Sequence, residues 1–401
     1  MKTQPSLGNW SRRKFLAASS AGLGLAWTPI LKAQEIPPPA KAGYQGPKVF
    51  LIRFGGGVRR KETISYPDKT FCPFLLHEMA GNHGTFLPNV SIASSPDIIT
   101  SHGQGTLQIL TGRYDKYQDI SNKFLGERFV PPAPTLFEYF RKNFQVESHE
   151  SLLINGEDRL QEEFFSFSET PGYGVDYRCQ VLSLYRFKLW LAQRDLDLAK
   201  GNTHQENAAK KLAELKEKNY RDPEGKLPGT QALNSFWESW HKEYGNTGFI
   251  NPRGDRLITE LAIQAMNKLH PKLVMINYND PDYVHWGPPA FYTRAISIID
   301  DCVKRLWQST QANEEYRNQT VFAVIPDCGR DDNRACSIPF QHHFGGKSSR
   351  EIFAILSGPG IPKGARIDKP YDQIDLAPTL GKLMGFPLSL VQGKTIPGVI
   401  S

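Results

Sequence analysis

The chain has 401 residues, which is enough for one large domain or two smaller ones. Hydrophobic residues make up 39% and charged residues 22%, a balance that excludes an intrinsically disordered chain. The net charge of +7 falls to +2 without residues 1–33, which carry five basic residues and no acidic residue, so the strongly basic surface of a nucleic-acid-binding protein is also excluded.

The N-terminal segment is predicted to be an export signal. Residues 11–16 read SRRKFL, a twin-arginine pattern, and the apolar stretch from Phe15 to Trp27 is too short to span a bilayer comfortably. We expect a signal peptide over residues 1–33 and a proline-rich linker over residues 34–47. This predicts a periplasmic or extracellular protein with no stable membrane span after cleavage. A short membrane anchor that stays attached is the alternative.

From residue 48 onward, buried strands alternate with amphipathic helices. Strands are predicted over residues 48–54, 85–94, 151–154, 273–278, 320–325 and 352–356, and helices over residues 74–80, 135–143, 257–269, 292–309 and 375–384. This alternation is typical of an α/β protein whose mostly parallel sheet is sandwiched by helices. Residues 162–251 are aromatic, charged and helical in pattern, and we expect them to form a helical insertion or cap.

A glycine run follows the first predicted strand. Gly55, Gly56 and Gly57 lead to a basic stretch that contains Arg59. Glycines let the backbone approach a ligand closely, and a neighbouring arginine suits an anionic one. A flexible turn with solvated charges is the alternative.

Metal-binding residue types follow two other predicted strands. Asp282 and His285 come after the strand at 273–278, and Asp327, Cys328 and the pair His342-His343 come after the strand at 320–325. Carboxylates, imidazoles and thiolates are the ligands of zinc and similar ions. Because ligands of open α/β sheets bind at the carboxyl ends of strands, these stretches predict a metal site. In the alternative, Asp282 caps a turn, His285 packs against Trp286, and the later stretch is an ordinary loop.

The five cysteines leave two interpretations of Cys328 open. The number is odd, so at least one cysteine is unpaired within a monomer. Cys328 and Cys336 flank a short loop and would form a disulfide in an oxidising compartment. A disulfide there excludes Cys328 as a metal ligand, so the two interpretations exclude each other.

The order and spacing of several motifs resemble the alkaline phosphatase superfamily, in particular its sulfatase and phosphodiesterase branches. The motifs are CPFLLHEMAGNHGTF at 72–86, LTGRY at 110–114, PTLFEYF at 134–140, DCG at 327–329, SGPGI at 357–361 and DLAPTL at 375–380. The resemblance implies one alkaline-phosphatase-like α/β domain over residues 48–401. It also implies an enzyme that uses divalent ions, zinc above all, to hydrolyse small-molecule phosphate or sulfate esters.

The same resemblance implies roles for individual residues. One ion would be bound by Asp282, His285 and either His342 or His343, and a second ion by Asp327 and Cys328. Counting back from LTGRY places the nucleophile on His102, with the hydroxyl of Ser101 or Thr100 as the alternative after a shift of one or two residues. In another interpretation, His102 is a metal ligand. Arg59 and Arg113 would contact the substrate.

Departures from the family pattern keep a second hypothesis open. The carboxylate that usually ends the first strand is absent from Gly55-Gly56-Gly57, and the usual Asp-His-Gly turn contains Cys328 instead of histidine. No Cys-x-Pro-x-Arg motif is present, which argues against a formylglycine sulfatase. The alternative function is therefore that of a catalytically inactive relative that serves as a binding or structural protein. The sequence does not determine the number of metal ions, the substrate or the oligomeric state.

Overall fold

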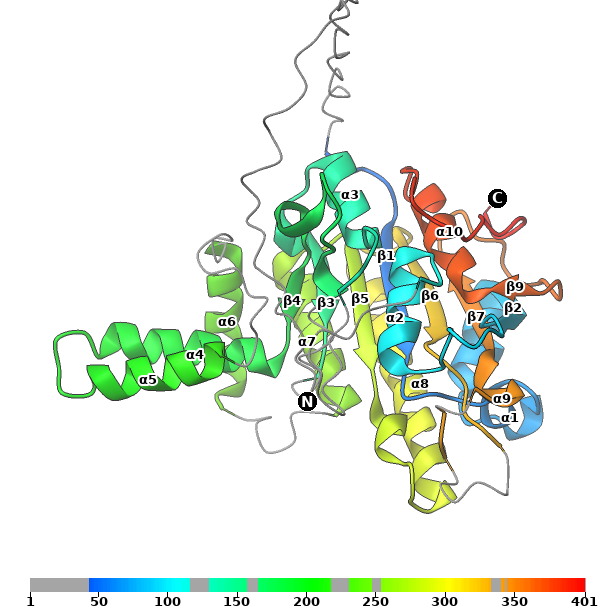
Figure 1. Ribbon diagram of the computed structural model, residues 1–401, viewed down its shortest axis with the longest axis horizontal. Coiled ribbons are helices and arrows are strands. Elements are labelled where there is room, and N and C mark those ends of the chain that lie inside the picture. Colours follow the sequence, from blue (N-terminus) through cyan, green and yellow to red (C-terminus); the bar gives the residue numbers. More distant parts are fainter. Residues whose placement is uncertain are drawn as a thin grey trace, which may run out of the picture. The chain divides into compact units, whose positions relative to one another are not determined.

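The computed structural model describes residues 43–115, 130–156, 165–217, 231–246, 254–332, 340–342 and 345–400 (Figure 1). These residues belong to one compact unit that spans residues 40–401. The predicted signal lies outside the described residues, as does most of the predicted linker. The linker's last part already joins the core, because the Tyr44 ring lies 4.9 Å from Phe140 and 4.8 Å from Phe144 between ring centroids.

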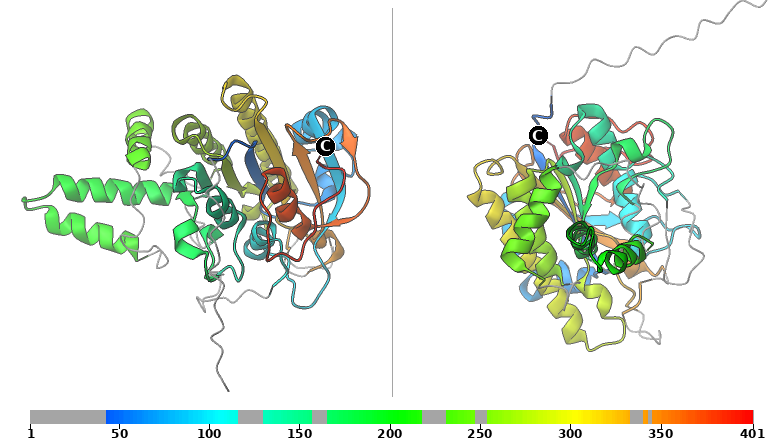
Figure 2. Two further views of the ribbon diagram at one scale, coloured as in Figure 1. Left: turned by 90° about the horizontal axis from the view of Figure 1, so that it is seen from above. Right: turned by 90° about the vertical axis from the view of Figure 1, so that its left-hand side faces the viewer.

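The described residues form a nine-stranded sheet in the order β4-β3-β5-β1-β6-β7-β2-β8, with β9 paired to β2 (Figures 1 and 2). The strands are β1 (Lys48–Phe54), β2 (Gly84–Ser91), β3 (Ser151–Ile154), β4 (Gln180–Leu182), β5 (Leu273–Tyr278), β6 (Thr320–Pro326), β7 (Glu351–Ser357), β8 (Ala365–Arg366) and β9 (Tyr371–Asp372). Pairing is parallel from β4 to β6, and β7 runs antiparallel to both β6 and β2. The prediction of a mostly parallel α/β sheet is confirmed.

Helices cover both faces of the sheet because both faces of its strands are apolar. Along β1, Val49 and Leu51 join the core under α2 (His102–Thr111), α3 (Leu136–Phe144) and α10 (Leu376–Leu383). Phe50, Ile52 and Phe54 point the other way, into the core under η2 (Phe74–His83), α7 (Asp255–Leu269) and α8 (Pro289–Ala312). Strands buried on both faces are the expected pattern for parallel sheets.

Short helical turns connect the longer elements. They are α1 (Arg60–Thr63), η1 (Pro67–Lys69), η3 (Ser148–Glu150), η5 (Gly174–Tyr177), η6 (Asp280–Tyr283), α9 (Lys347–Arg350) and η7 (Gln373–Asp375). Among them η6, directly after β5, contributes to the candidate site.

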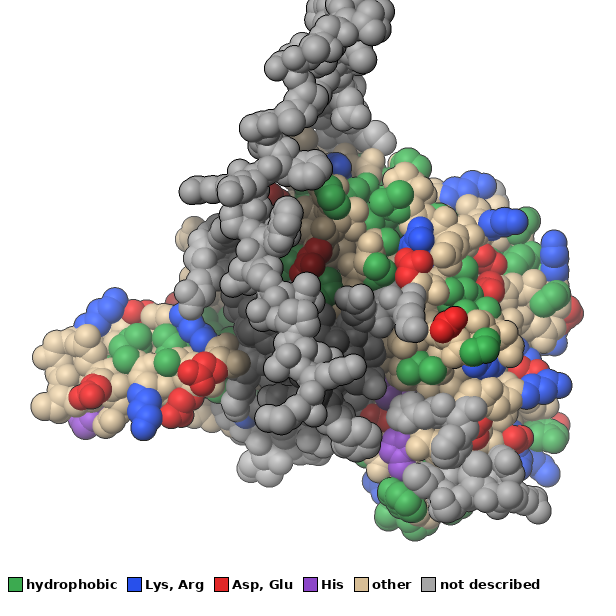
Figure 3. Space-filling model, in the orientation of Figure 1, with side chains coloured by type: hydrophobic (Ala, Val, Ile, Leu, Met, Phe, Trp, Pro, Cys, Tyr) green, Lys and Arg blue, Asp and Glu red, His purple; other side chains and the backbone are tan. Residues whose placement is uncertain are grey.

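The described part of the predicted helical insertion at about 162–251 contains a strand as well as helices. Its first described part reaches the sheet as β4, and the helices are α4 (Leu184–Leu198), α5 (Gln205–Lys216) and α6 (Gln231–Tyr244). Figure 1 shows α4 and α5 side by side beyond the β4 edge, and Figure 3 shows interspersed positive and negative side chains on this hairpin. Within the described ranges, none of the helices combines the length and apolar character needed to cross a membrane.

Asp300 of α8 caps η2 from a neighbouring helix and should make stability depend on pH. Its carboxylate accepts hydrogen bonds from the backbone N–H groups of Phe74 (3.0 Å) and Leu75 (2.8 Å). Burial raises the Asp300 pKa to about 6, above its unfolded value of about 3.9. Protonation of Asp300 therefore favours the folded state. This stabilisation is fully present below about pH 4 and is lost as the pH rises through about 6, which lowers the free energy of unfolding by about 3 kcal/mol.

The test is to compare unfolding free energies by urea titration at pH 4 and pH 7. Asp300→Asn should show a smaller loss of stability over this interval than the wild type. Asp301→Asn, at an exposed neighbouring position, should keep the wild-type loss. If the free energy of unfolding falls by the same amount between pH 4 and pH 7 in all three proteins, Asp300 does not have this role.

Candidate metal centre

Three adjacent strands bring the candidate residues to one edge of the sheet. β1 lies between β5 and β6, so that Phe54 pairs with both Tyr278 and Pro326. Asp327 follows β6 directly, and Asp282 lies in η6, four residues after the end of β5. The carboxyl ends of parallel strands meet at one edge, and this places the two carboxylates near each other.

The helix α2 adds His102 between these two carboxylates. Its N-cap is Ser101, whose hydroxyl oxygen accepts a hydrogen bond from the backbone N–H of Gln104. His102 is the first helical residue, and its Nδ1 lies 2.7 Å from Asp327 Oδ2 while its Nε2 lies 2.6 Å from Asp282 Oδ1. The imidazole thus bridges the ends of β5 and β6.

Two more imidazoles approach the same oxygen of Asp282. His285 Nε2 lies 3.2 Å from Asp282 Oδ1, and His342 Nε2 lies 3.6 Å from it. The ligand atoms of His102, Asp282 and His342 all lie within 4.8 Å of one another. One carboxylate oxygen surrounded by three imidazole nitrogens is a donor set that suits Zn²⁺, so these residues fit one ion. His343, the alternative ligand, lies outside the described residues.

The charges of these groups are strongly coupled. Burial opposes charge on His102, but Asp282 and Asp327 outweigh it and hold the His102 pKa well above 6.5. Burial likewise opposes charge on the two carboxylates, and His102 overcomes it, so that the pKa of Asp282 and of Asp327 is lowered. The two carboxylates therefore favour the protonated form of the His102 imidazole.

A second group of possible ligands consists of His102, Asp327 and Cys328. Asp327 is fully buried, and its Oδ1 accepts hydrogen bonds from the backbone N–H groups of Gly57 (3.3 Å) and Cys328 (2.8 Å). Cys328 is a free, buried cysteine, and burial together with Asp327 raises the pKa of its thiol to about 12. Cys336, its suggested disulfide partner, lies outside the described residues.

The glycine run after β1 leaves no room for a side chain. A Cβ atom at Gly55 would lie 2.2 Å from the Tyr278 carbonyl oxygen. At Gly56 (φ +85°) it would lie 2.5 Å from the backbone nitrogen of Asp282, and at Gly57 (φ +67°) 2.8 Å from the carbonyl oxygen of Gly329. The carboxylate that is missing from the sequence is therefore also excluded by the packing of this turn.

Arg53 is a buried residue of the site that the sequence analysis missed. Its guanidinium donates hydrogen bonds to Thr106 Oγ1 of α2 (2.8 Å) and to Asn279 Oδ1 after β5 (3.0 Å), and its Nε lies 3.9 Å from Asp327 Oδ2. One signal in the sequence could have identified it: Arg53 is the only arginine in the otherwise mostly apolar strand KVFLIRF. A charged residue in a buried strand needs partners, so it indicates a nearby polar site.

Arg330 is a second buried arginine of the site that the sequence analysis did not identify. Its fully buried side chain donates hydrogen bonds only to backbone carbonyl oxygens among the contacts that the structure describes. The acceptors belong to Gly56, Gly57, Pro281, Val284 and Phe340. One side chain thereby ties the turn after β1 to the turn that carries Asp282.

The two predicted substrate-binding arginines are engaged with acidic neighbours. Arg59 forms a two-pronged ion pair with Glu62 and lies over the rings of Tyr292 and Phe340. Arg113 pairs with Asp115 just beyond the C-terminal end of α2. His102 is at the opposite end of this ten-residue helix, about 15 Å away by the helical rise, so the structure does not bring Arg113 to the centre.

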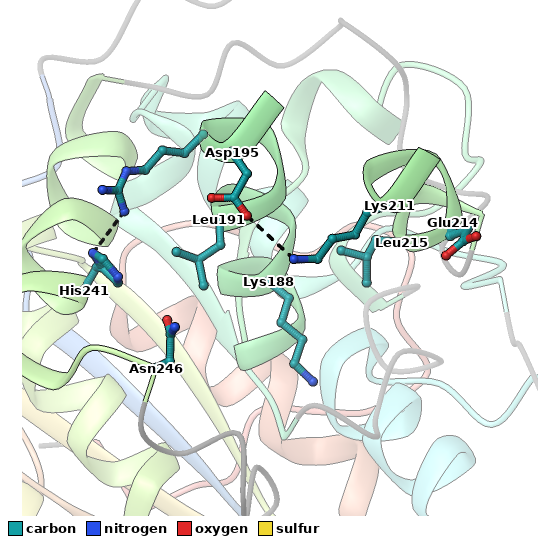
Figure 4. Close-up of a pocket in the computed structure, with 9 residues that line it drawn as sticks. Lys188, Leu191, Asp195, Lys211, Glu214, Leu215, His241 and Asn246 are labelled. Atoms are coloured by element: carbon teal, nitrogen blue, oxygen red, sulfur yellow. Dashed lines mark hydrogen bonds and ion pairs between the residues drawn. The ribbon is translucent and has the colours of Figure 1, made fainter. Parts of the chain in front are cut away.

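A separate pocket of about 500 Å³ lies among α4, α5 and α6 (Figure 4). Within its lining, Lys211 Nζ lies 3.6 Å from Asp195 Oδ2, and Arg194 Nη1 lies 3.1 Å from His241 Nδ1. None of the candidate metal ligands lines it. This pocket is therefore distinct from the metal centre.

Gly105 sets the distance between α2 and the end of β6. A Cβ atom there would lie 2.2 Å from the carbonyl oxygen of Asp327. Gly105→Ala should therefore destabilise the protein by about 1–3 kcal/mol, although alanine is the better helix former by about 1 kcal/mol. It should also weaken zinc binding, because His102 moves with the helix.

Urea denaturation and zinc titration of the purified protein test this expectation. Gly81→Ala is the matched control, since a Cβ atom there would meet only the Leu76 carbonyl oxygen at 3.6 Å. Equal stability and zinc affinity in the two variants would refute the role assigned to Gly105.

The chain has the alkaline phosphatase fold. It superposes on alkaline phosphatase PafA with a TM-score of 0.52 and 12% identity, covering 89% of this chain and 99% of that one. A mutant of PafA gives a TM-score of 0.56 and 13% identity, with 90% and 100% covered. No family model matches the chain.

One curated protein resembles part of the sequence. It is a 2,3-bisphosphoglycerate-independent phosphoglycerate mutase of Gracilaria tenuistipitata var. liui, 31% identical over 134 residues. The match covers 32% of this chain and 24% of the mutase. The chain thus spans about a quarter of that relative's length.

Proposed function

We propose that the protein is an exported, metal-dependent hydrolase of small-molecule phosphate or sulfate esters. The observation that carries this proposal is the convergence of three imidazole nitrogens on one oxygen of Asp282 at the carboxyl edge of the sheet. The fold shared with alkaline phosphatase PafA supports it. The proposal includes the twin-arginine signal over residues 1–33 and a periplasmic or extracellular location.

The residues of the centre divide into holding and positioning roles. Asp282, His285 and His342 would hold a divalent ion, for which Zn²⁺ is the best match to the donors. When bound, such an ion polarises an ester oxygen and stabilises negative charge in the transition state. Asp327 accepts from His102 Nδ1 and thereby fixes the orientation of that imidazole beside Asp282.

The test is metal analysis of the purified mature chain, followed by a turnover screen. Aryl phosphate, phosphodiester and aryl sulfate substrates should separate the substrate classes once zinc has been restored. Hydrolysis of at least one class that stops on chelation supports the proposal. Absence of any bound transition ion after incubation with zinc contradicts it.

A second candidate function, a binding or structural protein without hydrolytic activity, is favoured by one observation. The hydroxyls nearest the expected nucleophile position already serve the fold: Thr100 donates to the carbonyl oxygen of His342, and Ser101 caps α2. Zinc binding without turnover of any ester would support this function instead.

Ser101→Ala is expected to lower turnover by about 10³-fold while leaving zinc content unchanged. The Ser101 oxygen lies at the positive end of α2, where a developing negative charge on a nucleophile is stabilised. Ser183→Ala removes a similar N-cap from α4 and should cost only about 1 kcal/mol of stability. Unchanged turnover in Ser101→Ala would show that another group attacks the ester.

A further inference from the structure

We propose that the centre holds a single divalent ion, at Asp282, His285 and His342, and that the guanidinium of Arg53 supplies the positive charge at Asp327 in place of a second ion. This inference rests on the proposed function, because it concerns the same site. It makes Arg53 a positioning residue that acts through Asp327 and His102.

Arg53 is fixed beside Asp327. The side chain is fully buried and is anchored on both sides, by Thr106 of α2 and by Asn279 after β5. From that position its Nε faces Asp327 Oδ2 at 3.9 Å, and both side chains have no exposed surface. A buried guanidinium and a buried carboxylate stabilise each other, whereas either alone would be strongly destabilising.

Protein donors already surround Asp327. Its Oδ1 accepts from the backbone N–H groups of Gly57 and Cys328, while its Oδ2 faces His102 Nδ1 at 2.7 Å and Arg53. A carboxylate that ligates an ion needs an oxygen directed at the ion. Asp327 instead has the geometry of an outer partner that orients a histidine next to a metal site.

A second ion would find few ligands at this edge of the sheet. The turn at Gly55 to Gly57 excludes any side chain, so no carboxylate reaches this position from β1. Among the described residues, the possible ligands that are left for a second ion are His102, Asp327 and Cys328. Of these, the carboxylate of Asp327 already faces a fixed cation, because Arg53 Nε lies 3.9 Å from its Oδ2.

Electrostatics then disfavours a second ion. A divalent ion bound to Asp327 would lie within a few ångströms of the Arg53 guanidinium, and two like charges at such a distance repel each other strongly in a buried site. The guanidinium cannot move away without leaving Thr106 and Asn279. One ion and one arginine therefore complete the positive charge of the centre.

The first test is the zinc stoichiometry of the mature wild-type chain, measured by elemental analysis and calorimetric titration. One equivalent of zinc supports the inference. Two equivalents of similar affinity overturn the inference and leave the proposed function intact, whereas no bound zinc overturns both. The wild-type measurement does not depend on the folding of any variant.

The second test compares Arg53→Met with Arg53→Lys in the same titration, after circular dichroism has shown that each variant is folded. Without the cation, Asp327 should attract a second equivalent of zinc at least about tenfold more tightly than in the wild type. Lysine keeps the charge and should bind one equivalent as the wild type does. If Arg53→Met binds the second equivalent of zinc no more tightly than the wild type does, the inference is overturned.

Cys328 gives an independent check that needs no change at position 53. Because Cys328 is not a ligand of the single ion, Cys328→Ser should change zinc affinity by less than about twofold. The Co²⁺-substituted wild type should likewise lack absorption from sulfur-to-cobalt charge transfer. Such an absorption band, or a tenfold or greater loss of affinity in Cys328→Ser, would overturn the single-ion arrangement.

Discussion

Asp282→Asn is expected to abolish zinc binding and ester hydrolysis together. Asp282 Oδ1 is the atom on which His102, His285 and His342 converge, so it is the only carboxylate oxygen shared by all three imidazoles among the described residues. Asparagine keeps the shape of the side chain but removes its charge. We expect zinc affinity to fall by at least about 100-fold and turnover by a similar factor or more.

The measurement is zinc titration in parallel with steady-state kinetics on the best substrate of the ester screen. Asp195→Asn, exposed on α4, makes the same change of charge far from the sheet edge and should match the wild type. Turnover that survives in Asp282→Asn would move the metal centre away from η6.

Arg330→Met is expected to destabilise the protein by about 3–5 kcal/mol, because several buried carbonyl oxygens lose a hydrogen-bond donor and each one left unsatisfied costs about 1–3 kcal/mol. Methionine fills much of the volume but donates no hydrogen bond. The carbonyl oxygens of Gly56, Gly57, Pro281, Val284 and Phe340 would lose their shared donor. Each buried carbonyl left without a partner is costly, which makes this one of the largest single-residue effects we expect.

Urea denaturation with and without zinc separates the effect on the fold from the effect on the centre. Arg366→Met is the matched control, because Arg366 is exposed and pairs with Asp368 at the surface, where an ion pair contributes about 0–1 kcal/mol. If the two variants unfold at the same urea concentration, Arg330 does not tie these turns together.

The alternation of apolar strands and amphipathic helices was enough to predict the fold class. The predicted strand over residues 48–54 coincides with β1, and that over 320–325 with all but the last residue of β6. The reversed direction of β7 was not predictable, because side-chain periodicity carries no information about strand direction. The edge strands β8 and β9 have two residues each, too few to show any period.

The candidate site was predictable where chemistry follows strand ends and unpredictable where it depends on packing. Asp282, His285, Asp327 and His342 stand after buried strands, and the structure brings them to one edge. Arg53 instead looked like an ordinary strand residue, since its partners Thr106 and Asn279 are distant in sequence. Arg113 was assigned by motif alone, and the length of α2 separates it from the centre.

The packing around Gly55 restricts how this protein could change by mutation. A carboxylate introduced at position 55 would meet the Tyr278 carbonyl oxygen at 2.2 Å and the Arg53 Nε at 2.9 Å from its Cβ atom alone. A single substitution therefore cannot supply the missing ligand, and replacing Arg53 first would still leave the clash with the backbone of β5. Introducing a carboxylate at this turn would need coordinated changes on two strands, which makes that ligand difficult to acquire one residue at a time.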